Sequence, residues 1–264
     1  MIAAGHRRMS PFAGVLSDGA THQIALSLYG ADSYFSVAGA LLLYLDPGAT
    51  QVTGSVTTNT LAAAPSPTVT NTIQTVNGNT VGGVSIGSIR DFSIVGTAVT
   101  SSGTVQNTVN QTGSFTNAQQ FKISAAKYVQ SISQNTLTTV QTITTSPSGT
   151  RSTLDTYTYP LTVDLKLVYG ANGGGRQEAA IGQNLQVNRV VFDGGTETNP
   201  EARNYSVNTV DTLLFNSNFN IVGHRDQASS ADLAFYNDNV RCFQRHLEAV
   251  KNILTVVKTG CGKK

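Results

Sequence analysis

Charge, tryptophan and long apolar runs are scarce in this sequence of 264 residues. Lys, Arg, Asp and Glu make up 12% of the chain, about half of the roughly 25% found in typical soluble domains. A formal net charge of +2 provides no basic footprint, so we expect no nucleic-acid partner. The longest strongly apolar run covers residues 37–45, far short of the roughly 20 residues of a membrane-spanning helix. We therefore expect no membrane partner.

Cysteine is also rare: only Cys242 and Cys261 are present, and nothing near them has the spacing of a metal site. Their simplest use is a disulfide closing a loop of about 20 residues, which would stabilise the fold by about 3 kcal/mol. The triplets at Asn110 and Asn204 fit the N-glycosylation sequon. The first ten residues contain no signal peptide. These features predict a secreted or extracellular protein whose true N-terminus lies further upstream.

Hydroxyl side chains are abundant, with 34 Thr and 23 Ser, and this composition favours β structure. Residues 47–150 carry only four charges, a shift that indicates a domain boundary near residue 50. The expected domains are residues 1–50, which end a first β-sandwich, and residues 51–264, a C-terminal β-sandwich with Thr-rich loops. Short strands are expected at 84–94, 104–110, 121–132 and 135–144, with Gly, Asn and Ser turns between them.

Outside that stretch, the turn signature at 17–19 and the alternation at 24–28 predict a hairpin. The apolar run 34–45 predicts a central strand covered on both faces. Strict alternation predicts a strand over 161–169, followed by a loop at 170–175 and strands at 185–192, 205–214 and 218–222. Residues 240–257 fit a helix and a strand equally. Many short strands with regular turns indicate an all-β sandwich or barrel with antiparallel sheets.

Motifs for common chemistries are missing. The Gly-rich segments lack the pattern of a nucleotide-binding loop, and no nucleophile elbow is present. The four histidines are scattered singly, without the short-spaced pair of a zinc site. We therefore expect no metal and no organic cofactor.

Carboxylates are the more informative groups, because a buried carboxylate in a chain with so little charge needs a partner. Asp46 ends the most apolar predicted strand, where it either faces a cleft at the rim of a sheet or caps the turn that follows. Asp18 precedes Gly19 and reads as a hairpin-turn residue. His224 and Arg225 follow a glycine and form either a binding site for a polar ligand or a solvated loop.

Two blocks of sequence resemble the acid-active peptide N-glycanases of the A type, amidases that remove N-glycans from glycopeptides. The first block reads Pro11-Phe12-x-Gly14-x-Leu16-x-Asp18-Gly19-x-x-His22, then Gly30-Ala31 and Leu41-x-Leu43-Tyr44-Leu45-Asp46. The second reads Val222-Gly223-His224, then Arg241-Cys242-Phe243-x-Arg245-His246-Leu247-Glu248-Ala249. The Thr-rich middle of the chain carries no such likeness.

The resemblance implies jelly-roll-like β-sandwiches and a chain that is the C-terminal half of the enzyme. Its partners would be an N-glycopeptide substrate and the N-terminal half or heavy chain of the same enzyme. Hydrolysis of the glycan–asparagine amide suits paired carboxylates that act as base and acid. Asp46 is our first catalytic candidate, with Asp32 and Glu178 behind it. His22, His224 and Arg225 are the candidate substrate-binding residues.

A second hypothesis remains open from the residues themselves. A non-catalytic secreted β-sandwich that binds glycans or mediates adhesion would also suit the Ser/Thr/Asn-rich middle. Tyr157 and Tyr159 are its candidate aromatic contacts, with packing at a sheet edge as their alternative role.

Overall fold

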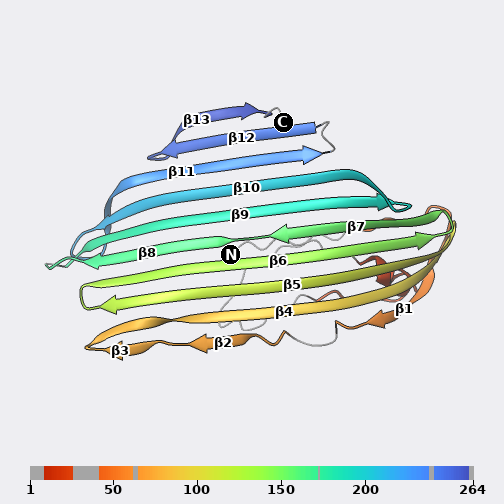
Figure 1. Cartoon of the computed structure of the whole chain (residues 1–264), viewed down its shortest axis with the longest axis horizontal. Helices are drawn as coiled ribbons and strands as arrows, with labels where there is room; N and C mark the ends of the chain where they lie inside the picture. Colours follow the sequence, from red (N-terminus) through yellow and green to blue (C-terminus); the bar gives the residue numbers. More distant parts are fainter. Residues whose placement is uncertain (1–8, 26–41, 62–64, 172, 238–240, 262–264) are drawn as a thin grey trace.

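Very long antiparallel strands build the protein, as the computed structural model of the chain shows (Figure 1). The structure describes residues 9–25, 42–61, 65–171, 173–237 and 241–261. Its described strands form one 13-stranded sheet. The prediction of an all-β protein with antiparallel strands is confirmed. None of the described helices is long and apolar enough to span a membrane.

Six strands of 17 to 22 residues form the body of the sheet. At about 3.3 Å per residue, the longest of them extends roughly 70 Å. Most neighbours in the sheet are also neighbours in sequence, so the chain winds back and forth as a meander. The six are β4 (Asn79–Thr100), β5 (Gly103–Ser124), β6 (Lys127–Ser146), β9 (Gly175–Asp193), β10 (Thr196–Phe215) and β11 (Ile221–Asn237).

Shorter strands complete the sheet at its centre and at both edges. β7 (Gly149–Thr158) and β8 (Leu161–Tyr169) both pair with β6 on one side and with β9 on the other. β1 (Thr53–Asn59), β2 (Thr68–Asn71) and β3 (Gln74–Val76) pair with β4. β12 (Arg241–Val250) and β13 (Ile253–Gly260) form the opposite edge. The open prediction for residues 240–257 is thereby resolved in favour of strands.

Tight turns with positive φ close three of the hairpins. Asn77-Gly78, Gly194-Gly195 and Lys251-Asn252 each have positive φ at both positions, as the two-residue turns that match the twist of antiparallel strands require. The sequence marks the first two with glycine. The Lys251-Asn252 turn contains no glycine.

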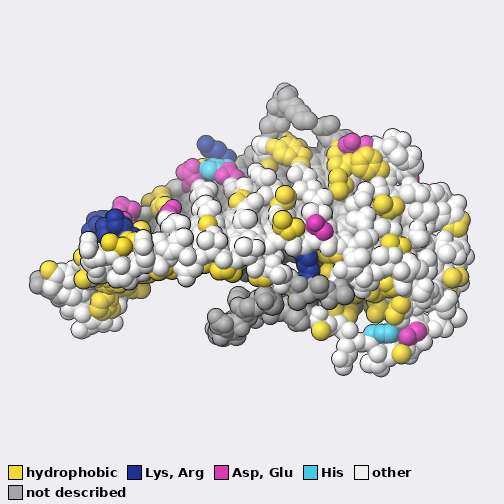
Figure 2. All heavy atoms as spheres, turned by 60° about the horizontal axis from the view of Figure 1, so that its bottom comes forward, with side chains coloured by type: hydrophobic (Ala, Val, Ile, Leu, Met, Phe, Trp, Pro, Cys, Tyr) yellow, Lys and Arg dark blue, Asp and Glu magenta, His cyan; other side chains and the backbone are white. Residues whose placement is uncertain are grey.

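The two faces of the sheet differ in chemistry. Cross-strand partners point to the same side of an antiparallel pair, so the register assigns each residue to a face. The inner face, defined by the buried cluster of Val109, Val140 and Tyr157, is the more apolar one. The outer face carries hydroxyl, amide and scattered charged side chains. Figure 2 shows how sparse the charged groups are over the visible surface.

Several predicted boundaries are wrong. Residues predicted to lead into a hairpin are helical instead, as η1 (Ser10–Phe12) and α1 (Ala13–Leu16). Pro11 in the first turn explains this, because its fixed φ suits a helix start. The segment 121–132 is broken by a turn at Ala125-Ala126, which no Gly, Asn or Pro marks. Residues 218–220 belong to a turn, and β11 begins at Ile221.

The apolar stretch 34–45 falls mostly outside the described residues. Its described part, residues 42–45, is exposed and has no strand assignment. The predicted strand at 24–28 also lies largely outside the described part, and residues 24–25 are not in a strand. The domain boundary at residue 50 stays a prediction.

Candidate functional site

The first resemblance block packs against one end of the sheet. Pro11 and Gly14 are buried, and both approach the sheet closely at glycines. A Cβ on Gly96 of β4 would lie 1.8 Å from the Pro11 carbonyl oxygen, and one on Gly14 would lie 2.4 Å from Gly54 Cα of β1. The absence of a side chain at these glycines lets the backbones of η1 and α1 pack directly against the backbones of β4 and β1.

Asp18 and His22 follow α1 and contact each other. His22 Nε2 lies 2.8 Å from Asp18 Oδ1, and the Ala20 amide donates to the same oxygen at 2.8 Å. The pKa of Asp18 lies below its ordinary value, chiefly because of the Ala20 amide and then because of His22. Asp18 lies in a turn, and Gly19 next to it has a φ of +82°, but the turn follows α1 and residues 21–25 form no strand, so the prediction of a hairpin turn is wrong for the described residues. His22 is held by this turn, with its ring partly exposed.

Asp46 joins its own turn to the β4–β5 hairpin. Its carboxylate accepts hydrogen bonds from the Ser101 hydroxyl at 2.6 Å, the Ser101 amide at 2.7 Å and the Gly48 amide at 2.9 Å. These donors lower the pKa of Asp46, the Ser101 hydroxyl most of all. Asp46 therefore stays ionised in mildly acidic solution. It caps the turn, as one of its two predicted roles requires.

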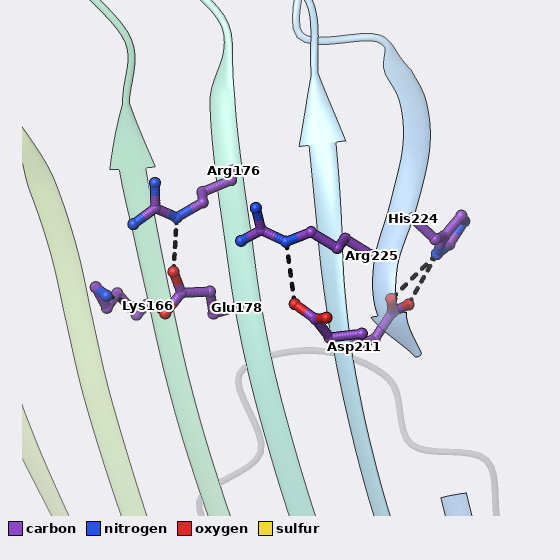
Figure 3. Close-up of polar contacts among 7 residues, drawn as sticks. Lys166, Arg176, Glu178, Asp211, His224 and Arg225 are labelled. Atoms are coloured by element: carbon purple, nitrogen blue, oxygen red, sulfur yellow. Dashed lines mark hydrogen bonds and ion pairs between the residues drawn. The ribbon is translucent and has the colours of Figure 1, made fainter. Parts of the chain in front are cut away.

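Glu178 forms an ion-pair cluster on the outer face. Arg176 Nε donates to Glu178 Oε1 at 2.6 Å, and Lys166 Nζ donates to Oε2 at 2.9 Å. Figure 3 shows the three side chains on neighbouring strands β8 and β9. The pKa of Glu178 is lowered, first by Arg176 and then by Lys166. A carboxylate with this environment is an acceptor and not a proton donor near neutral pH.

His224 and Arg225 point to opposite faces, because they are consecutive residues of β11. His224 Nδ1 lies 2.9 Å from Asp211 Oδ2, and Arg225 Nε lies 3.0 Å from Asp226 Oδ2 (Figure 3). The register pairs Arg225 with Thr212 and Thr212 with Glu178. Arg225 therefore shares the outer face with Glu178, while His224 and Asp211 lie on the inner face.

The structure does not bring Asp46 and Glu178 together. Glu178 pairs with Lys166, and the same row continues across β6 and β5 to Val81 at the start of β4. Asp46 is bonded to Ser101, just beyond the end of β4. Twenty residues of strand separate Val81 from Ser101, which corresponds to roughly 65 Å along an extended strand. Asp32 lies outside the described residues. The catalytic roles of these residues stay predictions.

A polar cluster around His246 lies near the disulfide. His246 Nδ1 is 2.6 Å from Asp232 Oδ1, and His246 Nε2 is 2.8 Å from Glu248 Oε1. The two carboxylates raise the pKa of His246, with Glu248 contributing more. Lys258 is the cross-strand partner of His246. Asp232, His246 and Lys258 line a shallow depression of about 460 Å³. The His246-x-Glu248 spacing was visible in the sequence, but Asp232 is joined to it only by the register of β11 and β12.

Cys242 and Cys261 are paired, with Cα atoms 5.6 Å apart. The expected disulfide therefore ties the end of β13 to the start of β12. A disulfide fits an extracellular protein. No group of three or more potential ligands for a metal ion occurs within the described ranges.

The aromatic pair of the second hypothesis lies on the inner face. The rings of Tyr157 and Tyr159 are stacked with centroids 6.4 Å apart and an interplanar angle of 6°. Tyr157 is only 5% exposed and packs with Val109 and Val140. Its ring therefore belongs to the core and offers no open platform for a sugar.

No known family model, curated protein or solved structure matches this chain.

Proposed function

We propose that the chain is the C-terminal part of an amidase that hydrolyses the glycan–asparagine bond of N-glycopeptides. The observation that supports this proposal is that Pro11, Gly14 and Asp46, described residues of the first resemblance block, all contact one end of the sheet. Pro11 packs on Gly96, and Asp46 binds Ser101 five residues further along the same strand and its turn. Five residues of strand span about 17 Å. Residues far apart in the block thus lie at the same end of the sheet.

Asp46 is ionised, as a carboxylate must be to stabilise positive charge that develops during hydrolysis. Its lowered pKa keeps it ionised, so it suits the role of an electrostatic stabiliser. The reaction adds the hydroxyl of water to the side-chain carbonyl carbon of asparagine and a proton to the departing glycosylamine nitrogen, leaving aspartate in the peptide. Glu178 lies at the other end of the long strands, so the proton donor would come from the N-terminal part of the enzyme.

Glycopeptide cleavage by the reconstituted enzyme tests this proposal. The chain is combined with the polypeptide encoded upstream in the same reading frame and incubated with a simple N-glycopeptide at mildly acidic pH. Mass spectrometry should detect free glycan and a peptide with aspartate in place of asparagine. Asp46→Asn should reduce the rate at least tenfold, whereas Asp193→Asn, at an exposed strand end, should leave it unchanged. A reconstituted pair that releases no glycan would refute the proposal.

A separate observation favours the second hypothesis of glycan binding without catalysis. A shallow trough of about 480 Å³ on the sheet is lined by amide and hydroxyl side chains, including Asn110, Thr112, Thr139 and Gln141. Asn110 Nδ2 already donates to Gln141 Oε1 at 3.3 Å. Such groups match the hydrogen-bonding chemistry of sugar hydroxyls.

Binding measurements separate the two functions. If the second hypothesis holds, isothermal titration with N-glycan oligosaccharides should give binding that Gln141→Ala weakens and Asp46→Asn leaves unchanged. Hydrolysis should be absent in every sample. Glycan binding that depends on Asp46 would argue against this alternative.

A further inference from the structure

The structure separates the two N-glycosylation sequons of the sequence. The sequon that begins at Asn110 lies in β5, and the one that begins at Asn204 lies in β10. The Asn110 side chain is half-buried, and its Nδ2 donates to Gln141 Oε1 at 3.3 Å. The Asn204 side chain is exposed. An N-linked glycan is bulky and needs an asparagine at the surface, so Asn204 is the better acceptor of the two.

Asn204 points to the polar side of the sheet. It lies an even number of residues before Thr212 in β10, and the pairing of this part of β10 with β9 has no register shift. Successive residues of a strand point to opposite sides, so Asn204 and Thr212 share the outer face with Glu178. A glycan on Asn204 therefore extends away from the buried cluster on the inner face.

Small side chains flank Asn204 on the outer face. Its cross-strand partners are Gln186 on β9 and Ala234 on β11, and Ala202 lies two residues before it in the same strand. Alanine side chains end at Cβ, so the surface beside Asn204 is low toward Ala202 and Ala234. The first sugar of a glycan has room to lie against the sheet on this side.

Tyr236 offers an aromatic surface next to this space. It pairs with Ala202 and so lies diagonally from Asn204, within reach of an aromatic side chain. Tyr236 is 37% exposed, and Gln244 Nε2 donates to its hydroxyl. Gln244 pairs with Ala234, so the tyrosine ring leans toward the row that contains Asn204. A sugar ring presents C–H groups on its faces, and such apolar surface packs against an aromatic ring.

We propose that Asn204 carries an N-linked glycan whose first sugar packs against Tyr236. The donor is a lipid-linked oligosaccharide pyrophosphate, used while the chain is still extended in a compartment that also forms disulfides such as Cys242–Cys261. A bond forms between Asn204 Nδ2 and the anomeric carbon of the first sugar, and the bond from that carbon to the pyrophosphate oxygen breaks. The lipid pyrophosphate leaves with the electron pair, and one Nδ2 proton passes to a base of the transferase.

The glycan restricts which surfaces of the protein other molecules reach. A bulky sugar chain on Asn204 keeps a flat protein surface away from the outer face of β9, β10 and β11. The trough lined by Asn110 and Gln141 lies over other strands and stays open. The proposal is independent of the amidase function, because it concerns a modification of this chain and not its activity.

Peptide mapping by mass spectrometry tests the assignment. The full chain is expressed in eukaryotic cells behind a cleavable secretion signal. Cell protein and medium are analysed together, so that a variant that is not exported is still measured. Most copies should carry a glycan on Asn204, and enzymatic removal of that glycan should leave aspartate at this position. Asn110 should be unmodified in most copies.

Variants of β10 make the assignment specific. Ser206→Ala should abolish the modification and Ser206→Thr should keep it, because the sequon requires a hydroxyl at its third position. Asn208→Gln is the matched control and should change nothing. Asn208 is exposed on the same face of β10, but the residue two positions after it is neither Ser nor Thr. Unmodified Asn204, or equal modification of Asn204 and Asn110, overturns the proposal.

Thermal unfolding tests the contact with Tyr236. The Tm of the glycosylated chain should exceed the Tm of the same chain after enzymatic deglycosylation. Tyr236→Ala should abolish this difference, whereas Tyr236→Phe should keep it. Each variant is compared with its own deglycosylated form, so any effect of the substitution on the fold itself cancels. A Tm difference that persists unchanged in Tyr236→Ala rules out the contact.

Discussion

Loss of the buried Asp155 carboxylate should destabilise the protein more than loss of any other single charge described above. Asp155 is 1% exposed, and Arg189 Nε donates to its Oδ1 at 2.6 Å. Asp155 also raises the pKa of Arg189. The cross-strand partners of Asp155 are Val140 and Arg189.

Removing one member of a buried ion pair costs about 3 to 5 kcal/mol, because the other charge stays desolvated. The Arg189 side chain is 31% exposed and regains part of its hydration, so we expect the lower end, about 3 kcal/mol, for Asp155→Asn. For a chain of this size, that loss corresponds to a fall in Tm of roughly 6 to 12 °C. Urea unfolding followed by circular dichroism gives the free energy directly.

Two variants make the reasoning refutable. Asp164→Asn removes an exposed carboxylate that binds the Ser131 hydroxyl, and it should cost less than about 0.5 kcal/mol. The double variant Asp155→Leu/Arg189→Met replaces both charges and should recover most of the stability. The reasoning is refuted if the free energy of unfolding of Asp155→Asn lies within about 1 kcal/mol of the wild-type value. It is also refuted if the double variant is as unstable as Asp155→Asn, because the Asp155–Arg189 ion pair would then not determine the loss of stability.

Three further predictions concern other parts of the chain. The two carboxylates raise the pKa of His246, so the charged imidazole contributes its full stabilisation below its ordinary pKa of 6.5, and this stabilisation is lost as the pH rises through the raised pKa. The Tm difference between wild type and His246→Gln should therefore shrink as the pH rises. A Tm difference that stays constant with pH would contradict this prediction. Gly96→Ala would place a methyl group 1.8 Å from the Pro11 carbonyl oxygen and should increase hydrogen exchange in residues 9–16, whereas Gly87→Ala in the same strand meets nothing within 4 Å and should not. Reduction of the disulfide, whose cysteines are 19 residues apart, should lower the free energy of unfolding by up to about 3 kcal/mol, and unchanged urea unfolding after reduction would refute that role.

The strand that alternates most strictly was predicted to the residue. Leu161–Tyr169 is β8 as the pattern required, because apolar and polar residues alternate from Leu161 to Leu167. The existence of β4, β5, β6, β9 and β10 was also predicted, but their lengths were not. The sequence reveals a strand by its period-2 alternation of apolar and polar residues. Strand bounds are therefore predicted poorly wherever polar residues occupy both faces of the sheet.

The predicted strands are too short because Asn, Gln and Gly residues inside the real strands were interpreted as turn residues. In β5, Asn117 donates from Nδ2 to Gln134 Oε1 at 3.1 Å on the buried side of the sheet, and Gln119 donates to Asn117 at 3.1 Å. Gly113 lies within the same strand, opposite Arg90 and Thr138. Asn, Gln and Gly thus pair across strands here, although in isolation they resemble loop residues.

The candidate site was predictable only where its contacts are local. The Asp18–His22 contact spans four residues and the Asp46–Gly48 bond spans two, and both follow from turn chemistry. The bond from Ser101 to Asp46 spans 55 residues, and the His246–Asp232 contact depends on strand register. Neither pattern nor composition contains that information, so the polar clusters of the sheet emerged only from the three-dimensional structure.

The meander order of the strands bears on how the protein is made. Because most strands pair with the strand synthesised just before them, the sheet can lengthen one hairpin at a time as the polypeptide leaves the ribosome. After each strand is added, the sheet ends in an unpaired edge strand of up to 22 residues. Strands of other nascent chains could pair with this edge. The last described hairpin, β12–β13, is tied by the Cys242–Cys261 disulfide. Until that disulfide forms, only strand pairing holds this last hairpin to the sheet.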